Sequence, residues 1–136
     1  MMLPFILAIA MQAAPAPSVQ VLSREMMSQI EDPKQVVARS APEFAALWKQ
    51  HSGTAPLPRV DFESRTVVAV FLGTRSSAGY GAEIVRTRRA DGKLIVEWQE
   101  RKPARDQVSA QVITSPAIIA SIPKFAGEIT FQKVEQ

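Results

Sequence analysis

The chain contains no cysteine and only one histidine, His51. Without cysteine, the protein has no disulfide, no thiolate metal site, no cysteine nucleophile and no lipidated cysteine of the bacterial lipoprotein kind. Zinc and iron sites built on histidines or cysteines need several such ligands, so the count excludes them. We therefore expect a fold that is held together by non-covalent contacts alone and that has no metal site.

The chain also lacks the short motifs that mark nucleophiles and nucleotide sites. No Gly-x-Ser-x-Gly sequence is present to supply a serine nucleophile for His51. Gly73–Ser77 lacks the Gly-Lys-Ser/Thr ending of a phosphate loop, and Gly79-Tyr80-Gly81 lacks the third glycine of a dinucleotide fingerprint. Asp61 and Glu63 are two positions apart, but acids on a surface that also carries arginines are usually solvated or ion-paired. We expect a protein that is not an enzyme, with no catalytic residues and no cofactor.

Charges of both signs are nearly balanced, with 16 Lys and Arg against 13 Asp and Glu and a formal net charge of +3. Nucleic-acid-binding proteins typically carry a clustered excess of basic residues, so this mixed surface argues against a nucleic-acid partner. A length of 136 residues and a hydrophobic content of 46% are enough for one folded domain with its own core. We expect residues 19–136 to form a single domain.

Residues 1–14 form an apolar run without any charge, and Pro15-Ala16-Pro17-Ser18 follows it. The run is shorter than the roughly 20 residues of a transmembrane helix, and Ala8-Ile9-Ala10 offers a small-x-small cleavage site. We interpret residues 1–18 as a signal peptide and a stiff Pro/Ala spacer, and expect a periplasmic or secreted protein without a membrane span in the mature chain. No Lys or Arg precedes the run, and the alternative is an apolar segment that packs on the domain.

Alternating and β-branched segments dominate the rest of the chain. Thr66–Leu72 is a continuous apolar run, which predicts a central strand covered on both faces. Asp91-Gly92 predicts a tight hairpin between two flanking strands. Pro116 interrupts the pattern, and an apolar stretch, Ala117–Ile122, follows it. The predicted strands, about seven in all, include Val19–Arg24, Lys34–Arg39, Thr66–Leu72, Tyr80–Arg88, Leu94–Gln99, Val108–Val112 and Glu128–Val134.

One helix is predicted after Ser40. Ser40 is a suitable N-cap and Glu43 lies three positions on, so each side chain can satisfy an amide at the helix start. Phe44, Leu47, Trp48 and His51 follow at helical spacing and form one apolar stripe, which favours a structural role for His51. The fold class is therefore α+β: a mainly antiparallel sheet, arranged as a sandwich or an open barrel, with one helix packed on it.

Four basic residues, Arg86, Arg88, Arg89 and Lys93, flank the predicted hairpin. Charges in such positions commonly protect strand edges from aggregation, and this is the interpretation that we favour. A basic binding face is the alternative.

The segment Gly73–Gly81 is the candidate functional loop. Its three glycines permit backbone shapes that other residues resist, and its tyrosine combines a rigid apolar ring with a hydroxyl, a combination common in protein interfaces. The alternative is that Tyr80 begins its strand and closes one end of the sheets. The candidate partner-binding residues are Thr74, Arg75, Ser76, Ser77, Gly79 and Tyr80.

Several motifs in order along the chain resemble the C-terminal domain of the PrcB family. They are Pro58-Arg59-Val60-Asp61-Phe62, the strand Val67–Gly73, Gly79-Tyr80 with Glu83-Ile84, Pro103, Ser115-Pro116 and Ile122-Pro123-Lys124. The resemblance extends roughly from Ser40 to Phe131 and departs from the family pattern at Ser76 and Ala78, where Pro and Gly are more typical. Ser28-Gln29-Ile30 and the helix that contains Trp48 resemble the usual lead-in of the family.

The family's namesake is an accessory subunit of a surface protease complex. The resemblance therefore implies a non-enzymatic exported module whose partner is another exported protein, such as a protease, contacted through the Gly73–Gly81 loop. Two alternatives remain open. The loop is also similar to those of chagasin-type cysteine-protease inhibitors, and Tyr80, Trp98 and nearby arginines are residues that could line a pocket for a small envelope ligand.

Overall fold

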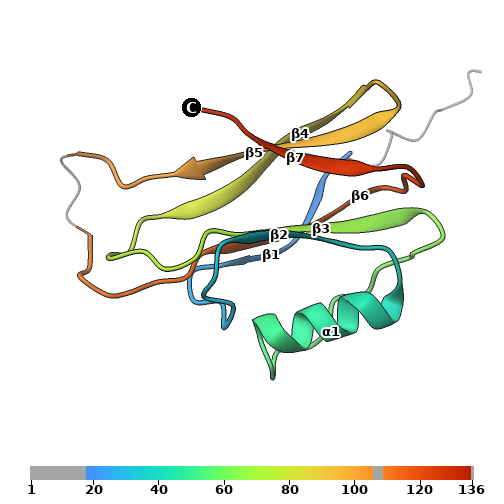
Figure 1. Ribbon diagram of the computed structural model, residues 1–136. Coiled ribbons are helices and arrows are strands. Elements are labelled where there is room, and N and C mark those ends of the chain that lie inside the picture. The colour runs from blue at the N-terminus through green and yellow to red at the C-terminus, as the bar shows by residue number, and fades with distance from the viewer. Residues whose placement is uncertain (1–17, 106–108, 136) are drawn as a thin grey trace, which may run out of the picture.

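The computed structural model describes residues 18–105 and 109–135. The proposed signal peptide, its cleavage site, the two spacer prolines and Val108 lie outside these residues. The described chain forms seven strands and one helix in three layers, with the helix on one face of a four-stranded sheet and a three-stranded sheet on the other (Figure 1). The elements are β1 (Gln20–Glu25), β2 (Lys34–Ala38), α1 (Ala41–His51), β3 (Arg65–Phe71), β4 (Gly81–Ala90), β5 (Lys93–Arg101), β6 (Ala117–Pro123) and β7 (Ile129–Lys133).

The strand order is β1-β6-β3-β2 in the larger sheet, with every neighbouring pair antiparallel. The smaller sheet has the order β4-β5-β7, in which β4 and β5 form a hairpin and β7 runs parallel to β5. The predicted turn is present, since Asp91 and Gly92 both have positive φ, 53° and 76°, as a two-residue type I′ hairpin requires. The α+β class is confirmed, and the sheets do not close into a barrel.

The predicted central strand is confirmed and lies at the middle of the core. Val67, Ala69 and Phe71 of β3 face the helix layer and pack with Phe44 and Trp48 of α1. Residues of opposite parity on the same strand face the smaller sheet: Val68 and Val70 pack with residues of β5 such as Val96 and Trp98. Residues 67–71 of β3 and Ala117–Ile122 of β6 are almost completely buried, because each strand has a packed layer on both faces.

Local signals also explain how α1 begins. Ser40 Oγ accepts a hydrogen bond from the Glu43 amide at 3.3 Å, and the Glu43 carboxylate accepts one from the Arg39 amide at 2.7 Å. These bonds satisfy amide groups at a helix start that have no partner within the helix. At the other end, Trp48 Nε1 donates to the Ala55 carbonyl at 2.8 Å, which ties α1 to the chain that follows it.

The prediction of a strand at residues 108–112 is wrong for those of its residues that the structure describes. Residues 109–113 form no strand, and the Ala110 carbonyl accepts a hydrogen bond from the Ala78 amide of the preceding loop instead. The apolar stretch that follows Pro116, to which the sequence pattern assigned no element, is the central strand β6. Tyr80 precedes its strand, because β4 begins at Gly81.

His51 is buried at the C-terminal end of α1, in the structural position that its stripe predicts. Its Nδ1 lies 2.7 Å from Ser28 Oγ, and its Nε2 lies 3.4 Å from Ser23 Oγ. The Gln29 amide also donates to the His51 carbonyl at 2.9 Å, so helix and N-terminal segment are joined through both backbone and side chain. Burial lowers the pKa of His51 from its ordinary value of 6.5, and the nearby Glu25 carboxylate only partly opposes this effect.

Because the pKa of His51 is lower in the folded than in the unfolded chain, the unfolded state binds the extra proton below about pH 6.5. The stability that neutral His51 contributes is therefore present above that pH, and we expect it to decline as the pH falls from 7 towards 5. Urea unfolding at several pH values measures this loss, and His51→Gln should largely abolish it. The substitution itself should lower the free energy of unfolding at pH 7.5 by about 1–3 kcal/mol, through lost buried hydrogen bonds. An equal decline in both proteins would contradict the assignment.

Candidate functional site

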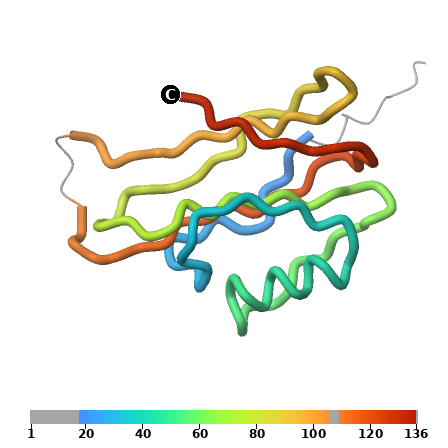
Figure 2. The backbone as a smooth tube through the Cα atoms, in the orientation of Figure 1, coloured from blue at the N-terminus to red at the C-terminus, as the bar shows by residue number. Residues whose placement is uncertain are grey.

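The Gly73–Gly81 loop leaves the end of β3 and leads into β4, at one end of the two stacked sheets. Residues 109–115 reach the same end on their way into β6, as the tube in Figure 2 shows. The two segments are far apart in sequence, yet they pair through an isolated antiparallel bridge between Arg75 and Thr114. The loop is therefore one side of a surface that both segments build.

Backbone hydrogen bonds hold the loop in one shape. The Arg75 amide donates to the Thr114 carbonyl at 2.8 Å, and the Thr114 amide returns a bond at 2.9 Å. Further along, Thr114 Oγ1 donates to the Ser77 carbonyl at 3.0 Å, and the Ala78 amide donates to the Ala110 carbonyl at 3.0 Å. We infer that these hydrogen bonds to Ala110 and Thr114 order the loop, so that it is not a freely flexible bend.

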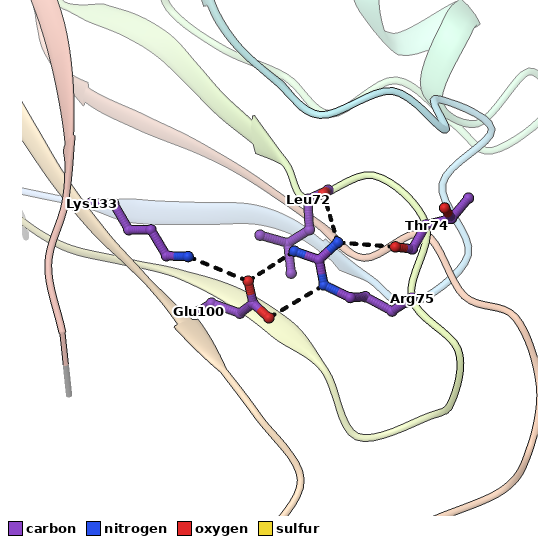
Figure 3. Close-up of polar contacts among 5 residues, drawn as sticks. All are labelled: Leu72, Thr74, Arg75, Glu100 and Lys133. Atoms are coloured by element: carbon purple, nitrogen blue, oxygen red, sulfur yellow. Dashed lines mark hydrogen bonds and ion pairs between the residues drawn. The ribbon is translucent and has the colours of Figure 1, made fainter.

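The side chain of Arg75 adds a second anchor (Figure 3). Its Nε and Nη2 donate to the two oxygens of Glu100 on β5, at 3.2 and 2.8 Å, while Nη1 donates to the carbonyls of Leu72 and Thr74. Lys133 Nζ of β7 lies 3.6 Å from the same carboxylate. The hydrogen bonds from Arg75 lower the pKa of Glu100 and raise that of Arg75, against the opposing effect of burial. Arg75 thus fastens the loop to the smaller sheet.

Two glycines of the loop are required by its backbone. Gly73 and Gly79 have φ of 81° and 98°, in the left-handed region that residues with a side chain rarely adopt. A Cβ on Gly73 would lie 2.9 Å from Pro33 Cδ, and one on Gly79 would lie 2.8 Å from Pro103 Cγ. The glycines therefore permit both the turn and the close approach of two proline-containing segments.

The structure brings the six predicted partner-binding residues together, but in two different settings. Thr74 and Ser76 are exposed, whereas Ser77, Gly79 and Tyr80 are half-buried. Arg75 is also half-buried, and its guanidinium is engaged by Glu100 and by loop carbonyls, 5.9 Å from the centroid of the Tyr80 ring. Arg75 is therefore placed to support the loop, while Thr74 and Ser76 present side chains to solvent.

A cleft of about 490 Å³ opens beside Tyr80. It is lined by Tyr80 and its two flanking glycines together with Arg24, Arg101 and Lys102, among other residues. Glu83 accepts hydrogen bonds from both arginines, at 2.8 and 2.9 Å from Arg24 and at 3.0 Å from Arg101. Trp98 does not line this cleft, because it is buried in the core with Lys133 Nζ 5.5 Å from its ring centroid. Trp98 therefore does not share this cleft with Tyr80.

Sequence reasoning missed the apolar residues that flank the loop in space. The Ser115 amide donates to the Met26 carbonyl, and Met27 pairs with Ser115 in an isolated bridge. This pairing carries Met26 and Met27 to the segment that bears Ile113, and the three side chains are 43%, 51% and 69% exposed. Each belongs to a stretch without a clear strand pattern, so only the apolar character of the two adjacent methionines hinted at a surface role.

A metal cluster and a membrane-spanning helix are both absent from the part of the chain that is described. Within residues 18–105 and 109–135, no group of three or more His, Asp and Glu side chains is arranged to hold a metal ion. No helix in those same ranges is long and apolar enough to cross a membrane. Asp61 accepts hydrogen bonds from the Glu63 amide and from Ser64 Oγ, which makes it a local turn residue.

Residues 66–123 match the PrcB C-terminal family. This match supports the resemblance to the PrcB family, and it spans less than half of the chain. It runs from β3 to the end of β6 and includes the whole candidate loop, β4 and β5. The PrcB-like motif at Val60–Phe62 and the helix lie outside the matched residues, so the match is narrower than the resemblance suggested. No curated protein and no solved structure matches the chain.

The first test of the loop compares two glycines that both have positive φ. Gly73→Ala places a methyl group against Pro33, whereas Gly92→Ala has open space around the new Cβ. We expect Gly92→Ala to lower the free energy of unfolding by about 1–2 kcal/mol, the strain of a left-handed residue, and Gly73→Ala to lower it clearly more. Urea denaturation of the two variants measures the difference. Equal losses would show that Gly73 is needed only for its φ.

The second test is a double-mutant cycle on the anchor, with Arg75→Gln, Glu100→Gln and the pair combined. Glu100 is almost fully buried and Arg75 binds both of its oxygens, so we expect a coupling of about 1–2 kcal/mol in the free energy of unfolding. Strictly additive losses would mean that the ion pair does not hold the loop.

Proposed function

We propose that this protein is a non-enzymatic exported module that binds another exported protein, and that it serves as an accessory subunit of a protease complex. In this proposal the Gly73–Gly81 loop contacts the partner. The match of residues 66–123 to the PrcB C-terminal family supports the association with a protease complex. The apolar, uncharged run at residues 1–14 supports export.

The observation that carries the proposal is the order of the loop. Its backbone is bonded to residues 110 and 114, and Arg75 ties it to Glu100, while Thr74 and Ser76 remain exposed. A surface that is already ordered loses little conformational entropy when it binds, so more of the contact energy appears as affinity. The loop has the properties of a preorganised contact.

The neighbouring side chains fit a protein partner. Met26, Met27 and Ile113 are exposed next to the loop, and Tyr80 adds a half-buried aromatic ring. Aromatic residues and methionine are enriched at protein interfaces, where apolar groups at the centre are surrounded by a polar rim. Thr74 and Ser76 supply hydroxyl groups suited to such a rim. A polypeptide surface with an apolar centre is therefore the partner that these residues favour.

The chemistry of the described residues supports a binding role without catalysis. The sole histidine is buried at the end of α1, where it contacts Ser28 and Ser23. Activated nucleophiles need a base at hydrogen-bond distance that a substrate can reach, and His51 is only 2% exposed. The loop itself carries hydroxyl groups and an arginine whose charge Glu100 neutralises.

The test is co-purification of the tagged chain from its own host, with the protease activity of the eluate measured on casein. Ser76→Arg places a bulky charge at an exposed loop position and should reduce the recovered activity about tenfold, the result of losing roughly 1.4 kcal/mol of binding. Gln50→Arg makes the same kind of change on the exposed face of α1 and should leave the activity unchanged.

Further variants separate the role of the loop from the role of the apolar neighbours. Met27→Ser and Ile113→Ser should each weaken recovery if the partner covers these side chains. Recovery of the same protease activity with the parent and the Ser76→Arg proteins would refute contact through the loop. An eluate with no protease activity from the parent chain would refute the association with a protease.

A further inference from the structure

A basic groove of about 230 Å³ lies at the far end of β4 from the candidate loop. Its lining includes Arg88, Arg89 and Lys124 around the apolar side chains of Leu94, Pro123 and Phe125. The groove residues Thr87–Arg89 lie six to eight residues along β4 from Gly81, and at roughly 3.3 Å per residue the groove is about 20–26 Å from the loop. Figure 1 shows the β4–β5 turn and the β6–β7 connection together at this end. The groove is thus separate from the proposed partner surface.

The groove has an uncompensated positive charge. None of its lining residues is acidic. Arg88 shares the carboxylate of Glu97 with Arg86, at 3.2 and 2.5 Å, so this trio keeps one positive charge in excess. Among the described residues, neither Arg89 nor Lys124 has an acidic partner. Two full positive charges therefore face the groove from two segments that are distant in sequence.

Two further charged residues at this end, Lys93 and Asp91, do not line the groove. Lys93 is paired with Glu128 at 3.2 Å, which leaves that pair neutral. Asp91 occupies the hairpin turn and is not part of the lining. The alternative role for such charges, protection of an edge strand, accounts for Arg86 and Arg88 on β4. It does not account for Lys124, which follows β6, a central strand.

The aromatic side of the groove is held in place by Arg39. The Arg39 guanidinium donates to the carbonyls of Phe125 and Gly127, which fixes the connection between β6 and β7. The Phe125 ring packs so closely on Gly127 that a Cβ there would lie 2.9 Å from its Cε1. Arg89 Cζ lies 5.5 Å from the centroid of the same ring, in cation–π contact. The Arg89 guanidinium is thus oriented before any ligand binds.

We propose that this groove binds a phosphate group. A phosphate monoester carries about −1.5 to −2 charges at neutral pH. It therefore balances two uncompensated cations better than a carboxylate, which carries a single negative charge. Arginine and lysine are the usual phosphate-binding side chains, arginine through its planar fork and lysine as a point charge. The small volume accommodates one such group. The phosphate is either that of a free small molecule or that of a lipid headgroup, and both present the same chemistry.

The test is an NMR titration of the full chain with inorganic phosphate and with glycerol 3-phosphate, at constant ionic strength. We expect the backbone amides of Arg89, Lys124 and Phe125 to shift, with both probes. The double variant Arg89→Gln/Lys124→Gln should weaken binding by about tenfold or more, because the loss of one hydrogen bond from a charged group typically lowers affinity by about that factor. Lys49→Gln/Arg59→Gln removes the same charge from exposed positions elsewhere and should change the affinity less than about twofold.

Sedimentation with phosphatidylcholine vesicles that contain phosphatidic acid identifies the source of the phosphate. If the parent protein binds these vesicles and the groove variant does not, the ligand is a lipid headgroup. If the parent protein binds the soluble probes alone, the ligand is a free phosphate. Absence of phosphate-dependent shifts, or an equal loss in the control variant, would overturn the proposal. Tighter binding of an amidated Glu-rich peptide than of phosphate would overturn it as well, since the groove would then select carboxylates. Because the parent loop is intact in every variant, these outcomes are independent of the proposed partner contact.

Discussion

The antiparallel pair of β3 and β6 is the constraint on which the rest of the structure depends. Its register joins Arg65 to Pro123 at one end and Phe71 to Ala117 at the other. Both strands are buried on their two faces, against α1 on one side and the smaller sheet on the other. A slip of one residue would exchange the two faces of each strand, so this register is strongly specified by burial.

This register also places both candidate surfaces. At the Phe71 end, the chain leaving β3 and the chain entering β6 must lie side by side, and the Leu72 amide donates to the Pro116 carbonyl at 3.0 Å. The pairing continues through Arg75 and Thr114 and so orders the loop. At the Arg65 end, the Lys124 amide donates to the Ser64 carbonyl at 2.9 Å and begins the connection that carries Phe125. One buried strand pair thus separates a hydroxyl- and apolar-rich end from a basic end.

Two carboxylates on β5, those of Glu97 and Glu100, have little solvent exposure and bind the basic side chains around them. Glu97 binds Arg86 and Arg88, and hydrogen bonds from Arg86 foremost lower its pKa. Glu100 binds Arg75 and Lys133. A carboxylate with little solvent exposure needs such partners, because its own hydration is lost. The arginines of this protein therefore differ in availability. Those beside Glu97 and Glu100 are shared or engaged, whereas Arg89 is stacked on an aromatic ring and forms no ion pair with any described residue.

The amino-acid sequence by itself determined the elements whose signals are local. Ser40 and Glu43 begin the helix, the continuous apolar run of Thr66–Leu72 requires a strand covered on both faces, and Asp91-Gly92 permits the positive φ of a tight hairpin. Only the tertiary structure decided that residues 109–113 form no strand, that the stretch after Pro116 lies at the centre of a sheet, and that Arg75 supports the loop through Glu100. These outcomes arise from pairings between segments far apart in sequence, and periodicity carries no information about which distant segment a residue will meet.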